Sequence, residues 1–347
     1  MIPQTSNNAA LAIKQQWQSI KQQNPRARAY DIAREINVSE MELVANQCGL
    51  TAIALQGNMV DMFKSLADLG EVMALTRNPY CVIEKTGTYG NIKTFGQMGL
   101  VLNREIDLRM FFSDWSYAYA VESKISDGIR RSIQFFNGSG VAIHKVFLKE
   151  SDQKRRFQSY IEKYKSQDQS IPNLPLQARV EPEVENPNID LTALRQDWQQ
   201  LKDVHDFHKM LKSHDLPRLQ ALRLIGEDFA KKVPNTSVRQ TLELARDHKV
   251  SIMVFVGNQS IIEIHTGPVE NLKKYGDWYN VLDKGFNLHL QENLIDQVWV
   301  VKKPTADGIV SSLEFFAADG TMIGQMFGER QEGKKEQEQW RQILEKI

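Results

Sequence analysis

The sequence predicts an α+β protein built by internal duplication, and three observations support this fold class. Residues 127–147 read DGIRRSIQFFNGSGVAIHKVF, and residues 307–327 read DGIVSSLEFFAADGTMIGQMF. The two segments lie 180 residues apart and share nine of 21 positions, where chance would give about one. Each half also begins with helix-type apolar spacing and ends in short β-rich runs. Since those runs meet at hairpin signals with no helix between them, we expect antiparallel sheets.

The first repeat is expected to occupy residues 1–165. Residues from about 10 to 68 are rich in Gln, Glu, Ala, Leu and Lys, and their period near 3.6 predicts helices. From about residue 72, runs such as IDLRMFF and VAIHKVF are separated by Asn, Gly, Asp and Pro, which predicts strands. NGSG at 137–140 predicts a hairpin turn, and residues 152–164 predict a charged helix.

The second repeat is expected at residues 191–347, with the same order of elements. Helices are predicted from about 191 to 247, strands from about 250 to 327, and a last helix up to Ile347, with a hairpin turn at ADG in 318–320. Between the repeats, residues 166–190 have little periodic apolar content and contain four prolines, Pro172, Pro175, Pro182 and Pro187. This composition predicts a semi-extended linker.

Composition narrows the class of protein. Lys plus Arg and Asp plus Glu both number 43, so no bulk charge attracts nucleic acid or an anionic membrane. Cys48 and Cys81 form no CxxC pair and fit reduced thiols better than a disulfide framework. The chain has no signal-peptide pattern and no apolar run of bilayer length. We therefore expect a cytoplasmic protein without membrane insertion, although a mature secreted chain would have similar features.

Residues 28–44 (RAYDIAREINVSEMELV) have the pattern of a helix–turn–helix. Asn37 and Val38 would form the turn, and Ser39 with Glu42 would form a capping box. A DNA-binding role would need basic residues on the second helix, which instead has Glu40 and Glu42. The pattern therefore favours a packing motif, and no nucleic-acid partner is expected.

His205 is the first candidate for a functional residue. Trp198, Leu201, His205 and His208 follow one another at spacings of three and four, which would place both histidines on one helical stripe with apolar residues. Asp203 would alternatively cap a new helix with His205 in its first turn, which favours a neutral, metal-competent imidazole. A structural histidine with an ordinary hydrogen bond remains the alternative. No carboxylate partner or further ligand at zinc spacing stands out.

Arg109 is the second candidate, because it lies inside the β-type run IDLRMFF. Such an arginine pairs with a carboxylate, faces solvent or lines a pocket. The repeat places Asn24 opposite His205 and His289 opposite Arg109. This broken symmetry predicts one site for the whole chain rather than one site in each half.

Other catalytic signatures are missing from the sequence. Gly87 and Gly267 recur at the repeat offset, but they more readily mark backbone turns than a phosphate cradle. The chain contains no GxGxxG, P-loop, GxSxG or HExxH motif.

Four segments together resemble the bacterial haem-degrading and haem-trafficking factors of the HemS/ChuS type: DVHDFHKML, NREIDLRMFF, KKPTADG and SLEFFAADGTMIGQMFGER. The resemblance covers nearly the whole chain, including the duplication. It implies two similar α+β halves, each with a large antiparallel sheet, and a haem cleft between them. The N-terminal repeat would supply the distal side of the haem and the C-terminal repeat the proximal histidine.

The resemblance also implies roles for individual residues. His205 corresponds to the proximal iron ligand, with His208 as its substitute, and Arg109 to the distal arginine. The other implied contacts to haem are Arg218, Met253, Lys303, Gln325 and Arg330. Phe327 departs from the family pattern, because many relatives have Tyr there and a hydroxyl contact is lost. The chemistry is coherent, since haem iron accepts a neutral imidazole and its propionates favour Lys or Arg.

Two haem functions and one other function follow as hypotheses. The first is haem degradation that releases iron, with catalytic roles for Arg109 and His205 and with an external electron donor. The second is a haem chaperone or storage protein that passes haem to another enzyme. Expected partners are haem itself, a haem importer, a reductase or a haem-accepting enzyme. A duplicated interaction protein that binds no haem is the third hypothesis.

Overall fold

The structure is a computed structural model that describes residues 4–25, 27–126, 128–149, 153–172, 184–330 and 333–347. Pro175 and Pro182 of the expected linker therefore lie outside the described residues. The chain divides into two compact units. Unit 1 contains residues 1–76, 85–179 and 258–261, and unit 2 contains residues 77–84, 180–257 and 262–347.

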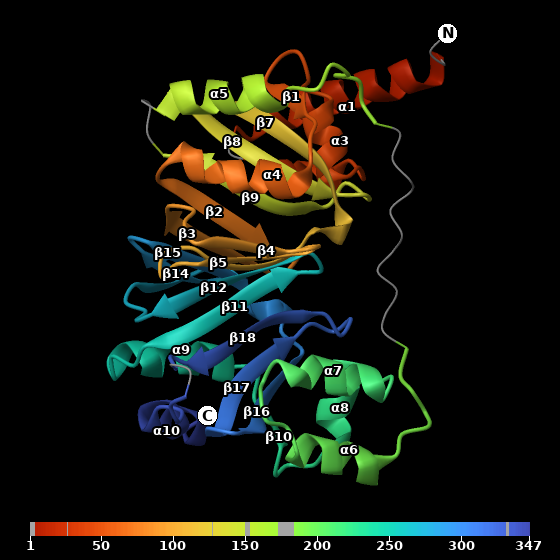
Figure 1. Cartoon of the computed structure of the whole chain (residues 1–347). Coiled ribbons are helices and arrows are strands. Elements are labelled where there is room, and N and C mark those ends of the chain that lie inside the picture. Colours follow the sequence, from red (N-terminus) through yellow and green to blue (C-terminus); the bar gives the residue numbers. More distant parts are fainter. Residues whose placement is uncertain (1–3, 26, 127, 150–152, 173–183, 331–332) are drawn as a thin grey trace. The chain divides into compact units, whose positions relative to one another are not determined.

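The first half of the sequence forms five α-helices and nine strands within the described residues (Figure 1). The helices are α1 (Gln4–Gln23), α2 (Ala29–Glu35), α3 (Glu40–Ala45), α4 (Met59–Lys64) and α5 (Lys154–Tyr164). The strands are β1 (Ala52–Leu55), β2 (Val72–Arg77), β3 (Cys81–Gly87), β4 (Ile92–Phe95), β5 (Met98–Leu102), β6 (Asp107–Phe111), β7 (Trp115–Ile125), β8 (Gly128–Asn137) and β9 (Ala142–Leu148).

The second half repeats this order in the residues that the structure describes. Its helices are α6 (Leu191–Gln199), α7 (Asp206–Ser213), α8 (Arg218–Leu224), α9 (Ser237–Asp247) and α10 (Glu338–Glu345). Its strands are β10 (Ala230–Val233), β11 (Ile252–Asn258), β12 (Ile261–Gly267), β13 (Leu272–Tyr275), β14 (Trp278–Asp283), β15 (Phe286–Gln291), β16 (Gln297–Thr305), β17 (Gly308–Phe316) and β18 (Met322–Gly328).

The strands form two sheets with equivalent strand orders. One order is β1-β7-β8-β9-β2-β3-β15-β14-β13, and the other is β10-β16-β17-β18-β11-β12-β6-β5-β4. The long neighbouring strands β7, β8 and β9, and likewise β16, β17 and β18, pair antiparallel. The predicted fold class, a duplicated α+β protein with two large antiparallel sheets, is therefore confirmed. The sequence did not predict that each sheet takes its last three strands from the other half of the chain.

Local turn chemistry explains several predicted features. In the β8–β9 hairpin, Asn137 Oδ1 accepts hydrogen bonds from the backbone of Ser139 and Val141, and Gly140 has a positive φ of 78°. Gly320, in the β17–β18 hairpin, has a φ of 83°. These conformations are accessible to glycine at no steric cost. Both hairpin predictions are confirmed.

The helix–turn–helix pattern forms α2 and α3 with the expected cap. Ser39 Oγ accepts from the backbone N–H of Glu42, and Glu42 Oε2 accepts from the backbone N–H of Ser39 at 2.8 Å. Ile32 of α2 and Leu43 of α3 are fully buried in one shared apolar cluster. These contacts agree with the interpretation as a packing motif.

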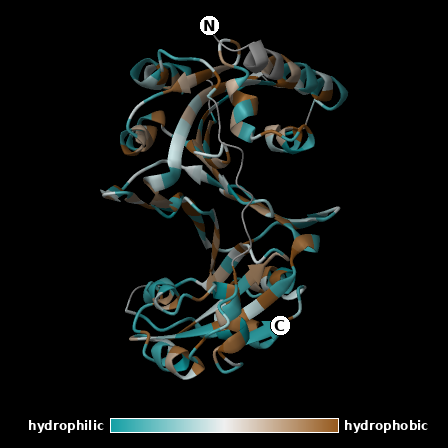
Figure 2. Cartoon of the chain, turned by 90° about the vertical axis from the view of Figure 1, so that its right-hand side faces the viewer, coloured by the Kyte–Doolittle hydropathy of each residue, from teal (hydrophilic) through white to brown (hydrophobic). Residues whose placement is uncertain are grey.

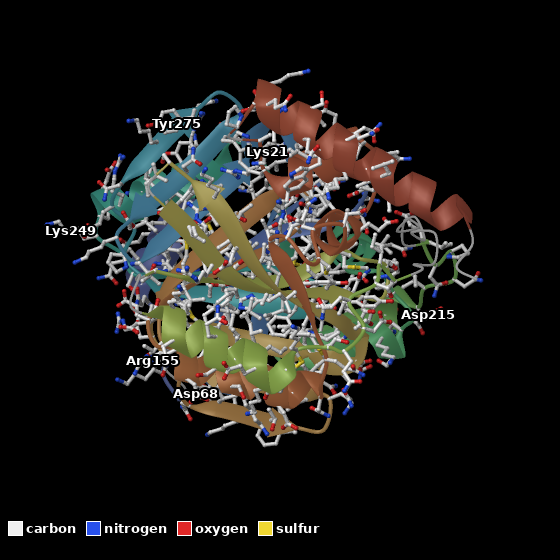
Figure 3. The ribbon with its side chains drawn as sticks, turned by 90° about the horizontal axis from the view of Figure 1, so that it is seen from above. Lys21, Asp68, Arg155, Asp215, Lys249 and Tyr275 are labelled. Carbon is white, nitrogen blue, oxygen red and sulfur yellow. The ribbon has the colours of Figure 1, made fainter. Side chains whose placement is uncertain are left out.

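Three helices end in the same way, which fixes where the next segment begins. Asn37, Asp215 and Lys249 each adopt a positive φ directly after a helix, and Figure 3 labels Asp215 and Lys249 among the exposed charged side chains. The following N–H groups bond back across the turn, from Val38 to Ala33 O, from Leu216 to Leu211 O and from Val250 to Ala245 O. This Schellman arrangement satisfies carbonyls that the helix end leaves free.

The expected helical regions also contain strands, which is a correction to the prediction. β1 lies within residues 10–68, and β10 lies within residues 191–247. Both are four-residue strands at the end of a sheet, paired with β7 and β16 respectively. Because their pairing partners lie far along the chain, tertiary pairing rather than local periodicity determines these strands.

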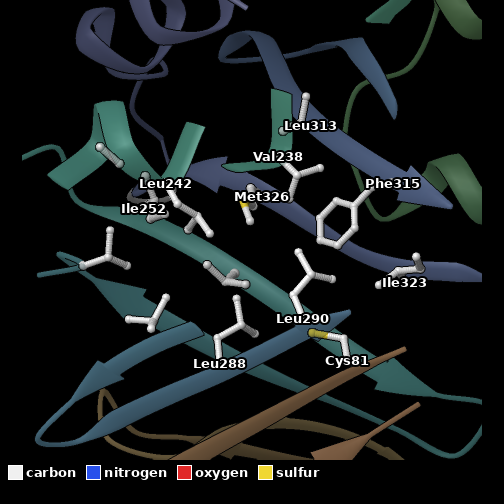
Figure 4. Close-up of a cluster of buried hydrophobic side chains, with 14 of the residues drawn as sticks. Cys81, Val238, Leu242, Ile252, Leu288, Leu290, Leu313, Phe315, Ile323 and Met326 are labelled. Atoms are coloured by element: carbon white, nitrogen blue, oxygen red, sulfur yellow. The ribbon is translucent and has the colours of Figure 1, made fainter. Parts of the chain in front are cut away.

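Each unit has its own apolar core. In unit 1, a cluster around Phe63, Trp115 and Phe135 packs between the sheet and α4, η1 (Ser65–Leu69) and α5. In unit 2, one cluster joins α9 and α10 to the sheet (Figure 4), with Val238, Phe315 and Trp340 fully buried. A separate cluster centred on Trp198 and Phe207 holds α6, α7 and α8. Hydrophilic and hydrophobic residues alternate around the helices (Figure 2), as burial of one face requires.

Within the described residues, no helix combines the length and hydropathy that a bilayer crossing would require.

Candidate functional site

A buried carboxylate in unit 2 organises several of the candidate residues. Glu314 lies on β17 with no exposed surface. Its two oxygens accept hydrogen bonds from Arg218, at 2.8 Å from Nε and 2.7 Å from Nη2. Arg218 is the first residue of α8, so the start of this helix is held to the sheet. This two-point contact fixes the plane of the guanidinium group.

Lys303, on β16, completes the cluster. Its Nζ lies 2.7 Å from Glu314 Oε1 and 3.2 Å from Ser312 Oγ, and only 2% of the residue is exposed. Ser312 also donates to Glu314 Oε1 at 2.9 Å. Two cations therefore share one carboxylate, and the cluster of Arg218, Lys303 and Glu314 carries a net positive charge.

Burial and charge act in opposite directions on these groups. Burial lowers the pKa of Lys303 to about 8, although the charge of Glu314 opposes this effect. For Glu314, burial raises the pKa, but the charges of Arg218 and Lys303 outweigh burial and hold the pKa well below its usual value. Glu314 is thus ionised at neutral pH, while Lys303 loses its charge under mildly alkaline conditions.

Aromatic rings and further candidates surround this cluster. The ring of Phe207, on α7, lies 4.9 Å from Cζ of Arg218 and 4.7 Å from Nζ of Lys303. Phe327 lies 5.8 Å from Lys303 Nζ, and Gln325 is the cross-strand neighbour of Glu314. Met253 pairs with Phe327 across β11 and β18. The structure therefore brings Arg218, Met253, Lys303 and Gln325 together. Phe327, the residue that differs from the family pattern, lies beside them.

His205 lies in a loop between two helices, which corrects the expectation of one continuous helical stripe. α6 ends at Gln199 and α7 begins at Asp206, with His205 at the N-cap position. The His205 side chain is 86% exposed, so it shares no buried face with Trp198. Asp203 lies in the turn between the two helices, and its Oδ1 accepts from the backbone N–H of His205 at 2.8 Å.

Asp203 also holds the imidazole, which the sequence did not indicate. The same carboxylate oxygen lies 2.6 Å from His205 Nδ1. Donation from the backbone N–H of His205, the largest favourable contribution, lowers the pKa of Asp203. An ionised carboxylate only accepts, so Nδ1 carries a hydrogen, and in the neutral ring the lone pair then lies on Nε2. Within the described residues no hydrogen bond occupies His205 Nε2, whereas Nε2 is engaged in four other histidines, namely His144, His214, His248 and His265.

Two hydrogen bonds tie α6 and the His205 loop to the β16–β17 hairpin. The N–H of Ala306 donates to Lys202 O at 2.9 Å, and Trp198 Nε1 donates to Lys302 O at 3.0 Å. The same hairpin contains Asp307, whose carboxylate lies 3.6 Å from Nη2 of Arg330. Arg330 also contributes electrostatically to the lowered pKa of Asp203. His208 lies on α7, exposed, one turn beyond His205.

Arg109 lies on β6 in unit 1, and its strand alternates as expected, with Leu108 and Met110 buried. Its Nη1 forms an ion pair with Asp107 and donates to Leu108 O at 3.1 Å. Burial raises the pKa of Asp107, and the contact with Arg109 opposes this. The structure thus shows the ion pair that was one alternative for this arginine. Its side chain remains 31% exposed in this ion pair.

Sequence reasoning missed Glu314 and the role of Asp203. A signal for Glu314 existed, because it is a charged residue inside the apolar run SLEFF and faces Gln134 in the repeat. For Asp203 the signal was its position two residues before His205, which indicated a helix cap but not a bond to the ring. Side-chain contacts of this kind depend on a turn whose conformation the sequence pattern does not specify.

Comparisons with known proteins agree with this architecture. The family model of the haemin-degrading HemS/ChuX domain matches residues 37–164 and 215–347, once in each repeat. The hemin transport protein HemS of Yersinia enterocolitica is 39% identical over 337 residues, covering 97% of this chain and 97% of that protein.

Two solved structures are similar over nearly the whole chain. Holo-PhuS, a heme-binding protein from Pseudomonas aeruginosa, is 42% identical, with a TM-score of 0.89 and coverage of 97% of this chain and 98% of that one. ChuS, a heme degrading enzyme from Escherichia coli O157:H7, is 36% identical, with a TM-score of 0.92 and coverage of 97% and 99%. With both repeats matched and relatives that span almost its full length, the chain belongs to the family of haemin-degrading HemS/ChuX-domain proteins.

Proposed function

We propose that this protein binds haem in haem utilisation, with His205 as the axial ligand to iron. The observation that carries the proposal is the state of the His205 side chain, an exposed imidazole whose Nδ1 is held by Asp203 and whose Nε2 is available. Neutral imidazole is a suitable axial donor for haem iron. The relatives support haem as the substrate or cargo, since holo-PhuS is a heme-binding protein and HemS is a hemin transport protein.

We assign the cluster of Arg218, Lys303 and Glu314 to the propionate end of a haem molecule. Haem propionates are carboxylates, and Lys303 and Arg218 form a site with a net positive charge after pairing with Glu314. Glu314 engages Nε and Nη2 of Arg218, so N–H groups on Nη1 are left for a second carboxylate. We assign Gln325 and Arg330 to the porphyrin edge and Met253 to the apolar wall, with Phe327 unable to donate a hydrogen bond.

Within this proposal, Arg109 acts on the haem face opposite His205 and His208 substitutes when His205 is lost. Arg109 cannot ligate iron as a cation, but its guanidinium can stabilise negative charge that develops during a reaction. A bound haem would supply the redox chemistry of ring opening, while the protein supplies ligation, orientation and electrostatics.

We further propose that the protein degrades haem and releases iron, using an external electron donor from a reductase. ChuS, which is described as a heme degrading enzyme and a heme oxygenase, favours this activity. PhuS, a heme-binding protein, favours the second candidate, a carrier that takes haem from an importer to an accepting enzyme. A histidine ligand and a cationic pocket are suited to both haem degradation and haem transfer.

One experiment separates the two candidates. The protein is loaded with haem without oxygen, then given oxygen and a reductant in the presence of catalase, and tetrapyrrole products and free iron are identified. Catalase removes free peroxide, which would destroy haem nonenzymatically. Open-chain tetrapyrrole with stoichiometric iron establishes degradation, whereas intact haem that moves to an acceptor protein establishes the carrier.

The ligand assignment has its own test. His205→Ala should shift the Soret band while the far-ultraviolet circular dichroism stays unchanged, and the double change with His208→Ala should shift it further. Titration should saturate at one haem per chain, because only the second repeat has a histidine at this position. An unchanged ferric spectrum in His205→Ala, or two equivalent tight haems, would refute the assignment.

A further inference from the structure

We infer that Asp203 is a positioning residue for the iron ligand, and that its ionised carboxylate makes His205 a stronger electron donor. The inference deepens the proposed function and depends on it, since it requires His205 to bind iron. It rests on geometry: Asp203 Oδ1 accepts from both the ring Nδ1 of His205, at 2.6 Å, and the backbone N–H of the same residue, at 2.8 Å.

The two bonds together fix the ring. The backbone bond places the carboxylate at the start of α7, and the ring bond selects the tautomer with hydrogen on Nδ1. The Nε2 lone pair then lies on the side of the ring away from Asp203. A histidine that ligates a metal commonly donates its other N–H to a carboxylate or carbonyl, and this partner orients the ring and raises its basicity.

Backbone hydrogen bonds hold the main chain at Asp203, whose side chain is 58% exposed. The N–H of Asp206 donates to Asp203 O at 3.1 Å. The N–H of Ala306 donates to the carbonyl oxygen of the preceding residue, Lys202. His214 offers an instructive contrast, because it also pairs with a carboxylate, Asp197, but does so through Nε2 at 2.8 Å. His214 therefore commits the nitrogen that His205 leaves available.

The test uses three variants that change charge and hydrogen bonding separately. Asp203→Asn keeps an oxygen that can accept from Nδ1 but removes the negative charge. Asp203→Ala removes both. Asp206→Asn is the matched control, because it removes a negative charge from the first turn of the same helix at a residue that makes no ring contact in the described structure.

The readouts are the iron–histidine stretching frequency of ferrous haem-loaded protein in resonance Raman spectra, and the reduction midpoint potential. We expect the frequency to fall from wild type to Asp203→Asn to Asp203→Ala, and the midpoint potential to rise in the same order. Haem affinity should fall by about 10-fold or more in Asp203→Ala. Asp206→Asn should match wild type in all three measurements.

Two outcomes would overturn the inference, and they are distinguishable. Equal frequencies in wild type, Asp203→Asn and Asp206→Asn would show that the carboxylate charge does not reach the iron, with His205 ligation intact. If His205→Ala leaves the ferric spectrum unchanged, the proposed ligand itself is wrong and the inference fails with it. A purely structural role for Asp203 would weaken haem binding in Asp203→Ala without the graded Raman shift in Asp203→Asn.

Discussion

The two units contain buried polar clusters at equivalent places, and their charges are reversed. In unit 1, Glu40 begins α3 and forms an ion pair with Lys145 on β9, whose cross-strand neighbour is Gln134. In unit 2, Arg218 begins α8 and pairs with Glu314 on β17, whose cross-strand neighbour is Gln325. The helix start thus carries the carboxylate in one unit and the cation in the other.

The clusters also differ in net charge. The pair in unit 1 is neutral, whereas unit 2 adds Lys303 at the position where the repeat has Ser123. A buried cation without a full counterion costs stability. The comparison teaches that duplication supplied the same facing pair of strand positions twice, Gln134 with Lys145 and Glu314 with Gln325, and that only the cluster in unit 2 has a net positive charge.

We expect the largest effect on stability from neutralising Glu314, the carboxylate that Arg218 and Lys303 share. Glu314→Gln leaves the buried Lys303 and the partly exposed Arg218 without a counterion, so the free energy of unfolding should fall by about 3–5 kcal/mol. Glu40→Gln should cost less, because only one cation, Lys145, is left without its partner. Urea denaturation of the haem-free variants measures both. A larger loss in Glu40→Gln would mean that the two clusters are not organised as described.

A change at Arg109 tests whether unit 1 affects the rate of haem turnover or the affinity for haem. If unit 1 contributes to reaction rather than to anion capture, Arg109→Ala should slow reductant-driven haem turnover by about 10²–10³-fold. Haem affinity should stay within a few fold of wild type. Stopped-flow turnover and haem titration give the two values. Lost affinity with normal turnover of loaded protein would instead make Arg109 a propionate anchor.

Lys303 and Lys145 should respond in opposite ways to the same substitution. Lys303→Met removes the uncompensated cation and leaves the Arg218–Glu314 pair, so stability should hold while haem affinity falls by about 10–100-fold, as expected for one charged hydrogen bond. Lys145→Met should lower stability, since Glu40 loses its partner, and should leave haem affinity unchanged. Haem titration and urea denaturation of both variants provide the measurements, and equal losses of affinity would remove the distinction between the units.

The smallest effect is a pH dependence that comes from Lys303. Its pKa of about 8 lies below the usual value because of burial, so the folded protein releases this proton before the unfolded chain does. As pH rises above about 8, the free energy of unfolding should increase up to the pKa of an unfolded lysine, while haem affinity falls as the cation is lost. Lys303→Met should abolish both trends, and a wild-type affinity that is constant across pH 8 would contradict the assignment.

The sequence predicted the elements that depend on local chemistry. The capping box of Ser39 and Glu42, the hairpin at Gly140 and the alternation around Arg109 all formed as expected. Their causes act within a few residues, through a cap, a positive φ or a strand period. The duplication itself was visible as a constant offset of 180 residues.

Only the tertiary structure decided the contacts between distant segments. The strands β1 and β10, the bonds of Glu314 to Arg218 and Lys303, and the exchange of three strands between the sheets join residues far apart in sequence. The bond from His205 to Asp203 is local, but it depends on a helix break that the tertiary contacts of Lys202 and Trp198 help to fix. The sequence by itself therefore determined the repeated α+β plan and the candidate residues, because periodicity, caps and repeats are written along the chain. Long-range pairing decided which of those residues meet, because the free energy of a buried ion cluster depends on neighbours that no local pattern specifies.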